Sequence, residues 1–279
     1  MSTARGLLEL TRPVNAIAAG SLPLLGAIVA GATTDHALPL MAAILATVLG
    51  TGAGNAINDY FDREVDAINR PGRPIPSGTV TPTQALVLTA VLFGVALALT
   101  LTLALAAIAI ALINLVALVT YTIFFKGTPG GGNLLVGYLV GSAFLFGAAA
   151  VGDWRAALVL FALAALATTS RELIKDVEDL AGDVEEGLTT LPAAIGPTRS
   201  LHVASGALAV AVVASPLPYL TDQFGAVYLA AVLPADAVML YGAYLAYDSP
   251  GRGQRVVKAG MFLAVVAFVA GRLAGLLLT

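Results

Sequence analysis

The 279-residue sequence contains no cysteine, two histidines, one tryptophan and few charged residues. The lack of cysteine excludes disulfides, thiolate metal ligands and a thiol nucleophile. His36 and His202 are too few to build a histidine-rich metal site. Charged residues make up 11% of the chain, whereas a soluble domain carries about a quarter. The formal net charge of −3 argues against a nucleic-acid partner.

Apolar residues are abundant instead, at 58% of the chain with a mean hydropathy of +0.91. They form nine runs, each long enough to cross a hydrocarbon core of about 30 Å. These runs cover residues 14–33, 38–57, 83–103, 105–125, 134–151, 155–174, 199–220, 226–247 and 256–278. We expect an all-α integral membrane protein with nine transmembrane helices in a single domain, residues 1–279. Because no polar residue divides the third run from the fourth, a tight hairpin is expected near residues 101–106.

The basic residues predict the topology. If the N-terminus is cytoplasmic, twelve of the fourteen lysines and arginines fall on the cytoplasmic side, as the positive-inside rule requires. Arg155 and Arg272 are the exceptions. We therefore expect a multi-pass protein of the cell membrane, with its C-terminus outside.

Two acidic clusters share one spacing, D-x-x-D-x-x-x-D, and each directly follows an apolar run. Their aspartates are Asp59, Asp62 and Asp66 in the first and Asp176, Asp179 and Asp183 in the second. Offsets of three and seven residues place three carboxylates on one helical face. A proline–threonine pair then opens the next helix in both halves, at Pro82 and at Pro197. This repetition indicates a duplicated helical unit.

Three carboxylates on one face repel one another unless a cation neutralises them. Mg²⁺ is bound through oxygen ligands, commonly one or two carboxylates together with phosphate oxygens. Two facing clusters therefore predict Mg²⁺ ions with a diphosphate between them. Two solvated acidic helix ends are the alternative interpretation.

At these residues the chain resembles the UbiA superfamily of intramembrane prenyltransferases. The signature N-D-x-x-D-x-x-x-D is complete over residues 58–66, and the second signature, D-x-x-x-D, matches Asp179 and Asp183. Residues 12–15, 69–78 and 170–179 are most similar to the archaeal geranylgeranylglycerol-phosphate geranylgeranyltransferases. The resemblance implies Mg²⁺-dependent transfer of a geranylgeranyl group from its diphosphate to the hydroxyl of a lipid-like acceptor, geranylgeranylglyceryl phosphate, in membrane lipid biosynthesis.

Such a reaction assigns roles to three groups of residues. The expected metal ligands are Asn58, Asp62, Asp66, Asp176, Asp179 and Asp183, of which Asp62, Asp66, Asp179 and Asp183 are the catalytic candidates. The basic residues expected on the diphosphate are Arg70, Arg73 and Lys126. The aromatic side chains expected to line the substrate and face an allyl cation are Tyr121, Tyr60 and Phe124.

Two other functions remain open from the sequence. An aromatic-acceptor prenyltransferase, making a quinone or haem precursor, would use the same donor chemistry. A secondary transporter would also combine internal repeats with charges inside the membrane. Transporter sites lie near the bilayer midplane, however, whereas these acidic residues lie at one membrane boundary.

Two structural expectations concern helix packing. Three G-x-x-x-G motifs, at 50–54, 137–141 and 271–275, are expected to form close helix seams. Asp236 and Arg272 are expected to pair inside the membrane at similar depth, because an isolated charge there is costly.

Overall fold

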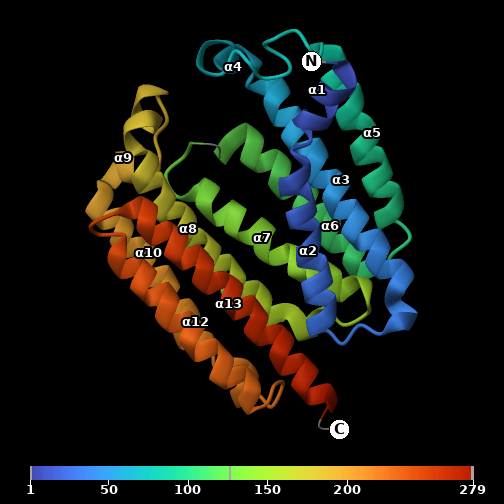
Figure 1. Ribbon diagram of the computed structural model, residues 1–279, viewed down its shortest axis with the longest axis vertical. Coiled ribbons are helices and arrows are strands. Elements are labelled where there is room, and N and C mark those ends of the chain that lie inside the picture. The colour runs from blue at the N-terminus through green and yellow to red at the C-terminus, as the bar shows by residue number, and fades with distance from the viewer. Residues whose placement is uncertain (1, 126, 278–279) are drawn as a thin grey trace.

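The computed structural model describes residues 2–125 and 127–277, and these ranges contain helices and no strand (Figure 1). In the first half the elements are α1 (Thr3–Leu10), α2 (Pro13–Val29), η1 (Thr34–His36), α3 (Ala37–Phe61), α4 (Arg63–Asn69), α5 (Pro82–Thr100), α6 (Leu105–Thr120) and η2 (Tyr121–Phe125). In the second half they are α7 (Gly131–Ala150), η3 (Trp154–Ala157), α8 (Leu158–Glu185), α9 (Leu191–Ile195), α10 (Pro197–Ala214), α11 (Leu217–Leu220), α12 (Ala226–Leu245) and α13 (Pro250–Leu277).

Seven helical segments in the described residues are long and apolar enough to cross a membrane, so the chain is a multi-pass membrane protein. They are Thr34–Phe61, Pro82–Thr100, Gly131–Ala150, Trp154–Glu185, Pro197–Leu220, Ala226–Leu245 and Pro250–Leu277. The bent pair α1–α2 makes eight if it is counted as one span. By helix length and composition, the described residues therefore contain seven or eight spans rather than the nine expected from the sequence.

The two expected spans that differ have local causes. Between α1 and α2 the chain bends by 41°, and Arg12 at the bend has the left-handed φ of 47°. Helix α6 has 16 residues, about 24 Å at 1.5 Å per residue, which is short of the hydrocarbon core. The five residues after it form a π-helical turn, η2, rather than continuing the α-helix to Phe125.

Several local predictions are confirmed. Helix α5 ends at Thr100 and α6 begins at Leu105, where the hairpin was expected. Pro82 and Pro197 are the first residues of α5 and α10. The start of α5 is also capped, because the Thr81 side chain accepts a hydrogen bond from the backbone N–H of Gln84 at 3.2 Å.

Helix α7 occupies the middle of the bundle (Figure 1), and eleven of its twenty residues are buried. It packs on α2 through Gly147 and on α8 through Gly137 and Gly141. A Cβ on Gly147 would lie 1.9 Å from the carbonyl oxygen of Pro23, and one on Gly26 of α2 would lie 1.9 Å from that of Phe144. A Cβ on Gly137 or Gly141 would meet α8 backbone oxygens at 2.6 Å. The expected seam at 137–141 is thus confirmed, and a second one joins α2 to α7.

The two acidic motifs lie at the same end of the bundle. The first ends in α4 and the second leads into α9, and Figure 1 shows both helices, with α1, at that end. The last turn of α13 lies at the opposite end. The fold therefore brings together charges that are more than a hundred positions apart in the sequence.

The seam between α2 and α7 generates a stability prediction. Gly26→Ala should lower the free energy of unfolding by about 1–3 kcal/mol, because two helix backbones must separate to admit one methyl group. Thermal unfolding of the purified protein in detergent measures the loss. Gly206→Ala is the control, since a Cβ at Gly206 in α10 meets no heavy atom within 4 Å. Equal melting temperatures for both variants would contradict the close approach.

Candidate functional site

A chamber of about 610 Å³ lies among α2, α3, α5, α6 and α7. Its wall is mostly apolar, but several amides and one phenol face it. These polar residues are Asn15, Asn55, Asn58, Asn114 and Tyr121. The chamber can therefore hold a long hydrocarbon chain, with polar groups to bind the end of that chain.

The motif Gly50-x-x-x-Gly54 lines this chamber and does not form the close seam expected for it. A Cβ on Gly50 would meet no heavy atom within 4 Å, and one on Gly54 would touch only Leu118, at 3.4 Å. Gly94 of α5, also in the wall, is similarly open. Small residues here leave space inside the chamber rather than bringing two helices together.

The first acidic motif is held by two arginines. Asp59 is buried at the end of α3, and its Oδ1 accepts from Arg12 Nη2 at 2.6 Å and from Arg73 Nη1 at 3.2 Å. The same Arg73 nitrogen donates to Asp66 Oδ2 at 2.5 Å. Arg73 thus bridges two carboxylates of one motif, which relieves the repulsion that the spacing implied.

The break between α1 and α2 is held by side chains of α3, the helix that carries Asp59. Asn55 Nδ2 donates to the carbonyl oxygen of Thr11 at 3.1 Å, and Asp59, one turn further along α3, pairs with Arg12. A left-handed backbone at a non-glycine residue costs free energy and persists where its surroundings hold it. These two α3 side chains hold Thr11 and Arg12 in place.

The second acidic motif lies on the last turns of α8. Asp176 Oδ2 accepts from Asn133 Nδ2 of α7 at 2.8 Å, and Asp179 pairs with Lys175 at 2.9 Å. Asn133 is a buried residue at the start of α7 that sequence reasoning missed. The available signal was an amide immediately before an apolar run, where a buried polar group needs a partner.

Tyr121 connects the two motifs. It lies in η2 and lines the chamber. It is within electrostatic range of Asp62 from the first motif, of Asp176 from the second, and of Glu172, one turn before Asp176. Carboxylates of both halves of the chain therefore lie near Tyr121.

The donor set fits a hard divalent cation, because its members are carboxylate and amide oxygens. Within residues 2–125 and 127–277, however, no three histidine, cysteine or acidic residues already form a group that could hold a metal ion. Asp66 and Asp179 are instead engaged by Arg73 and Lys175. Each ion pair engages one oxygen of its carboxylate, Oδ2 in both cases.

Of the other expected site residues that the structure describes, one lies in the chamber wall and the rest lie outside it. Arg70 is exposed, and Lys126 lies outside the described residues. Tyr60 does not face the chamber: its ring stacks under the Arg63 guanidinium, with 4.7 Å to the ring centroid. Phe124 is 67% exposed. Of the three aromatic candidates, Tyr121 is the one in the chamber wall.

Asn114 is a further residue that sequence reasoning missed. It lies in the middle of the otherwise apolar α6, lines the chamber, and its buried Oδ1 has no hydrogen-bond partner among the described residues. The signal was present in the sequence, since a lone amide within a membrane helix is costly and marks a functional position.

The expected Asp236–Arg272 pair is wrong. Asp236 accepts a hydrogen bond from Ser215 Oγ at 2.5 Å, whereas Arg272 packs against Gly31, beyond α2. The depth estimate failed because Gly271 contacts Tyr228. Arg272 therefore lies at the level of a residue eight positions before Asp236, about 12 Å away along α12.

These features define an intramembrane protein with an apolar chamber that ends between two acidic motifs. The sequence model of the UbiA prenyltransferase family matches residues 20–266, and the chain belongs to that family. The expected family resemblance is thereby confirmed, and the membership supports an enzyme rather than a transporter.

Three known proteins are similar to this chain over nearly its whole length. A digeranylgeranylglyceryl phosphate synthase of Natronomonas pharaonis is 58% identical over 98% of this chain and 99% of its own. A solved structure concerned with digeranylgeranylglyceryl phosphate synthase superimposes with a TM-score of 0.88 at 32% identity, covering 98% of this chain and 100% of that one. A UbiA homologue from Archaeoglobus fulgidus, bound to GPP and Mg²⁺, has a TM-score of 0.74 at 17% identity and covers 96% and 98%.

The ion pair of Arg12 with Asp59 generates a prediction. Asp59→Asn and Arg12→Gln should each lower the melting temperature, and the double variant should lose less than the sum of the two. The coupling should lie at the low end of about 0.5–3 kcal/mol, because the Arg12 side chain is 43% exposed and solvent weakens its pairing.

A matched control uses an exposed pair at the same end of the bundle. Glu64 pairs with Arg63 and its side chain is 85% exposed, so Glu64→Gln should change stability little. Strictly additive losses for Asp59 and Arg12 would show that the α1–α2 break does not depend on their contact.

Proposed function

We propose that this protein transfers a geranylgeranyl group from geranylgeranyl diphosphate to the hydroxyl of geranylgeranylglyceryl phosphate, forming an ether in archaeal membrane lipid biosynthesis. The observation that carries the proposal is the apolar chamber whose polar end, at Asn58 and Tyr121, faces carboxylates of both motifs. The activity named for the Natronomonas relative, 58% identical, supports the choice of substrates.

The donor would lie with its isoprenoid chain in the chamber and its diphosphate between the motifs. Apolar walls take up the chain through the hydrophobic effect, and they keep water from the reacting carbon. Gly50 and Gly94 leave room for the chain where a larger side chain would occupy the space. Entry would be sideways from the bilayer, since the chain is insoluble in water.

A bound metal would be held by oxygen ligands from both halves of the chain. The proposed ligands are Asn58, Asp62, Asp66, Asp176, Asp179 and Asp183. When bound, Mg²⁺ supplies charge compensation for the departing diphosphate. The Archaeoglobus homologue, which contains GPP and Mg²⁺, supports this cofactor.

The basic residues would act on the same leaving group. We propose that Arg73, which bridges Asp59 and Asp66, exchanges these carboxylates for diphosphate oxygens when substrate and cation enter. Guanidinium groups bind phosphate oxygens through paired, charge-assisted hydrogen bonds. Arg70 and Lys126 are proposed as further diphosphate contacts.

Tyr121 is proposed to face the allyl cation that forms as the carbon–oxygen bond breaks. An aromatic face attracts a cation within about 6 Å of its centroid, and Tyr121 lines the chamber at its polar end. The acceptor hydroxyl then attacks the cationic carbon and loses its proton. An aspartate of the motifs would serve as the base that takes this proton.

We further propose that the molecule is a single domain crossing the membrane nine times. The bent pair α1–α2 and the short α6 would complete the seven longer spans. The N-terminus and both motifs would face the cytoplasm, which the distribution of lysine and arginine supports.

The product assay tests the proposed function. Purified protein in detergent, given Mg²⁺, labelled geranylgeranyl diphosphate and geranylgeranylglyceryl phosphate, should form a labelled ether lipid that mass spectrometry identifies. With 4-hydroxybenzoate in place of the glycerol lipid, label should stay in the donor. Transfer to the aromatic acid and not to the glycerol lipid would support the aromatic-acceptor alternative instead.

Metal dependence tests the two-motif site. Asp62→Ala and Asp179→Ala should each abolish turnover while the melting temperature stays near wild type, because each removes one proposed ligand. EDTA should stop the wild-type enzyme, and added Mg²⁺ should restore it. Glu185→Ala is the control, since this exposed α8 residue lies outside the motif. Near-normal turnover by either aspartate variant would contradict the model.

A further inference from the structure

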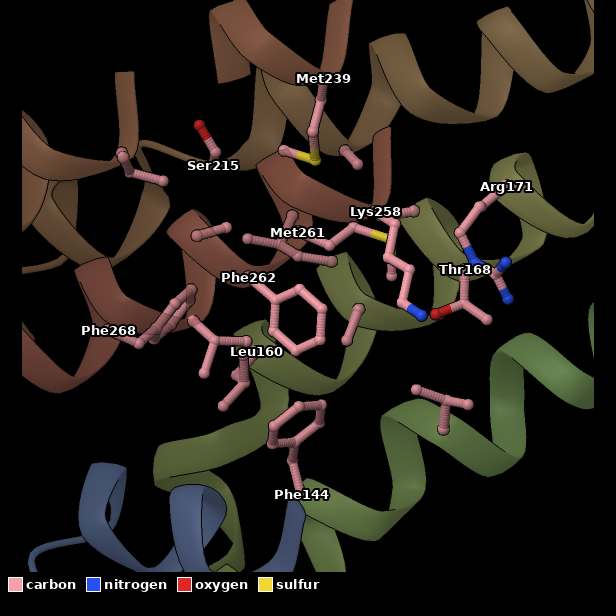
Figure 2. A pocket seen from close by; sticks show the side chains of 18 of the residues that line it. Phe144, Leu160, Thr168, Arg171, Ser215, Met239, Lys258, Met261, Phe262 and Phe268 are labelled. Carbon is pink, nitrogen blue, oxygen red and sulfur yellow. The ribbon is translucent and has the colours of Figure 1, made fainter. Parts of the chain in front are cut away.

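A second cavity, of about 200 Å³, lies on the other side of α7 (Figure 2). It is enclosed mainly by α8, α12 and α13. Most of its wall is apolar, with Phe144, Phe262 and Phe268 among the larger side chains. Phe262 is also 64% exposed, so the cavity wall reaches the lipid-facing surface of α13. The proposed donor and metal sites do not include this cavity.

Helix α8 lines the second cavity with one face and packs against α7 with another. Its residues in the second cavity follow helical spacing and are Leu160, Leu163, Ala164, Ala167, Thr168 and Arg171. The neighbouring position, Thr169, points instead toward α7, where its hydroxyl contacts the carbonyl oxygen of Asn133 at 3.4 Å. Asn133 also donates to Asp176 of the second motif, so the second motif and a wall of the second cavity belong to the same helix, α8.

One end of the second cavity is polar and basic. Thr168 is 2% exposed, and its buried Oγ1 has no hydrogen-bond partner in the described part of the chain. Figure 2 shows the Lys258 ammonium directed toward this hydroxyl, with the Arg171 guanidinium beside them. Lys258 forms no ion pair with any described residue, whereas Arg171 is partly occupied by Glu172 and Gln254.

A buried hydroxyl without a partner and an unpaired ammonium at the end of an apolar cavity fit an anionic amphiphile. The hydroxyl and the two cations can donate to phosphate oxygens, and the apolar wall fits a hydrocarbon chain. The opposite orientation is unfavourable, because Asp236 lies deeper in the same wall with one buried oxygen unpartnered and would repel an anion. The headgroup therefore belongs at Lys258.

We propose that this second cavity binds the acceptor, with its phosphate at Lys258, Arg171 and Thr168 and its hydrocarbon chain among the phenylalanines. The identity of the acceptor in this inference rests on the proposed function. The binding of an anionic amphiphile at this site does not depend on it. The two cavities share Leu22 and Val140 in their walls, so donor and acceptor chains would lie side by side. Arg171 lies five residues before Asp176, about 7.5 Å along α8, which a glycerol backbone can span.

Steady-state kinetics with the full-length protein tests the phosphate contact. Lys258→Gln should raise KM for the phosphorylated acceptor about tenfold, as expected from the loss of one charge-assisted hydrogen bond. KM for the prenyl diphosphate should not change, and neither should KM for the same prenylglycerol without its phosphate. Arg255→Gln is the control, because Arg255 is an exposed cation on the same helix, as Lys258 is, but lies outside the cavity wall.

A second pair of variants tests whether the apolar part of the second cavity binds the hydrocarbon chain of the acceptor. Ala264→Phe, in the cavity wall, should weaken both acceptors equally, whereas Ala259→Phe, exposed on the same helix, should not. A rise in KM for the prenyl diphosphate in Lys258→Gln, or equal effects of Lys258→Gln and Arg255→Gln, would overturn the assignment.

Binding without turnover separates this inference from the proposed function. Prenylglycerol phosphate alone should raise the melting temperature of the wild-type protein and not that of Lys258→Gln, even if no transfer to it is found. An excess of anionic bilayer phospholipid that abolished the shift would assign the cavity to bulk lipid and overturn the acceptor assignment. A full shift in Lys258→Gln would do the same.

Discussion

Close packing of α7 against its two neighbours is the constraint on which both cavities depend. Gly26 and Gly147 bring α2 and α7 to backbone contact, and Gly137 and Gly141 do the same for α7 and α8. The hydrophobic effect does not hold helices together within lipid, so such contacts depend on the near approach of small residues. Because α7 is fixed from both sides, Asn133 at its start reaches Asp176, and the cavities open on either side of one rigid helix.

The charges are arranged so that the acidic motifs are stable before any ligand arrives. Asp59 and Asp66 share Arg73, Asp59 also pairs with Arg12, and Asp179 pairs with Lys175. An unneutralised carboxylate near the hydrocarbon boundary would be costly. Arg73 thus has two uses, as a counter-ion within the protein and as a phosphate ligand in the proposed reaction.

Local sequence patterns predicted the elements and the motifs well, whereas contacts between helices required the structure. Pro82, Pro197 and the hairpin before α6 depend on neighbours in the chain. The second aspartate motif lies within one helix, α8, as its spacing predicted, whereas the first is interrupted at Asp62, between α3 and α4. Asp176 instead bonds Asn133, 43 positions away, and Asp236 bonds Ser215 rather than Arg272. Such contacts depend on how each helix is rotated and shifted relative to its neighbours, which apolar runs do not specify. The role of Gly50 was missed for the same reason.

The short α6 has a consequence for the enzyme in its membrane. With 16 residues, the helix is shorter than the hydrocarbon core of a bilayer of ordinary thickness, and the turn that carries Tyr121 follows directly from its end. Helices and bilayers of unequal length adjust to each other by tilting or thinning, at a modest cost for each ångström. The thickness of the surrounding lipid therefore bears on the depth of the catalytic end. An enzyme that makes membrane lipid would in this way be coupled mechanically to the bilayer that its own product builds.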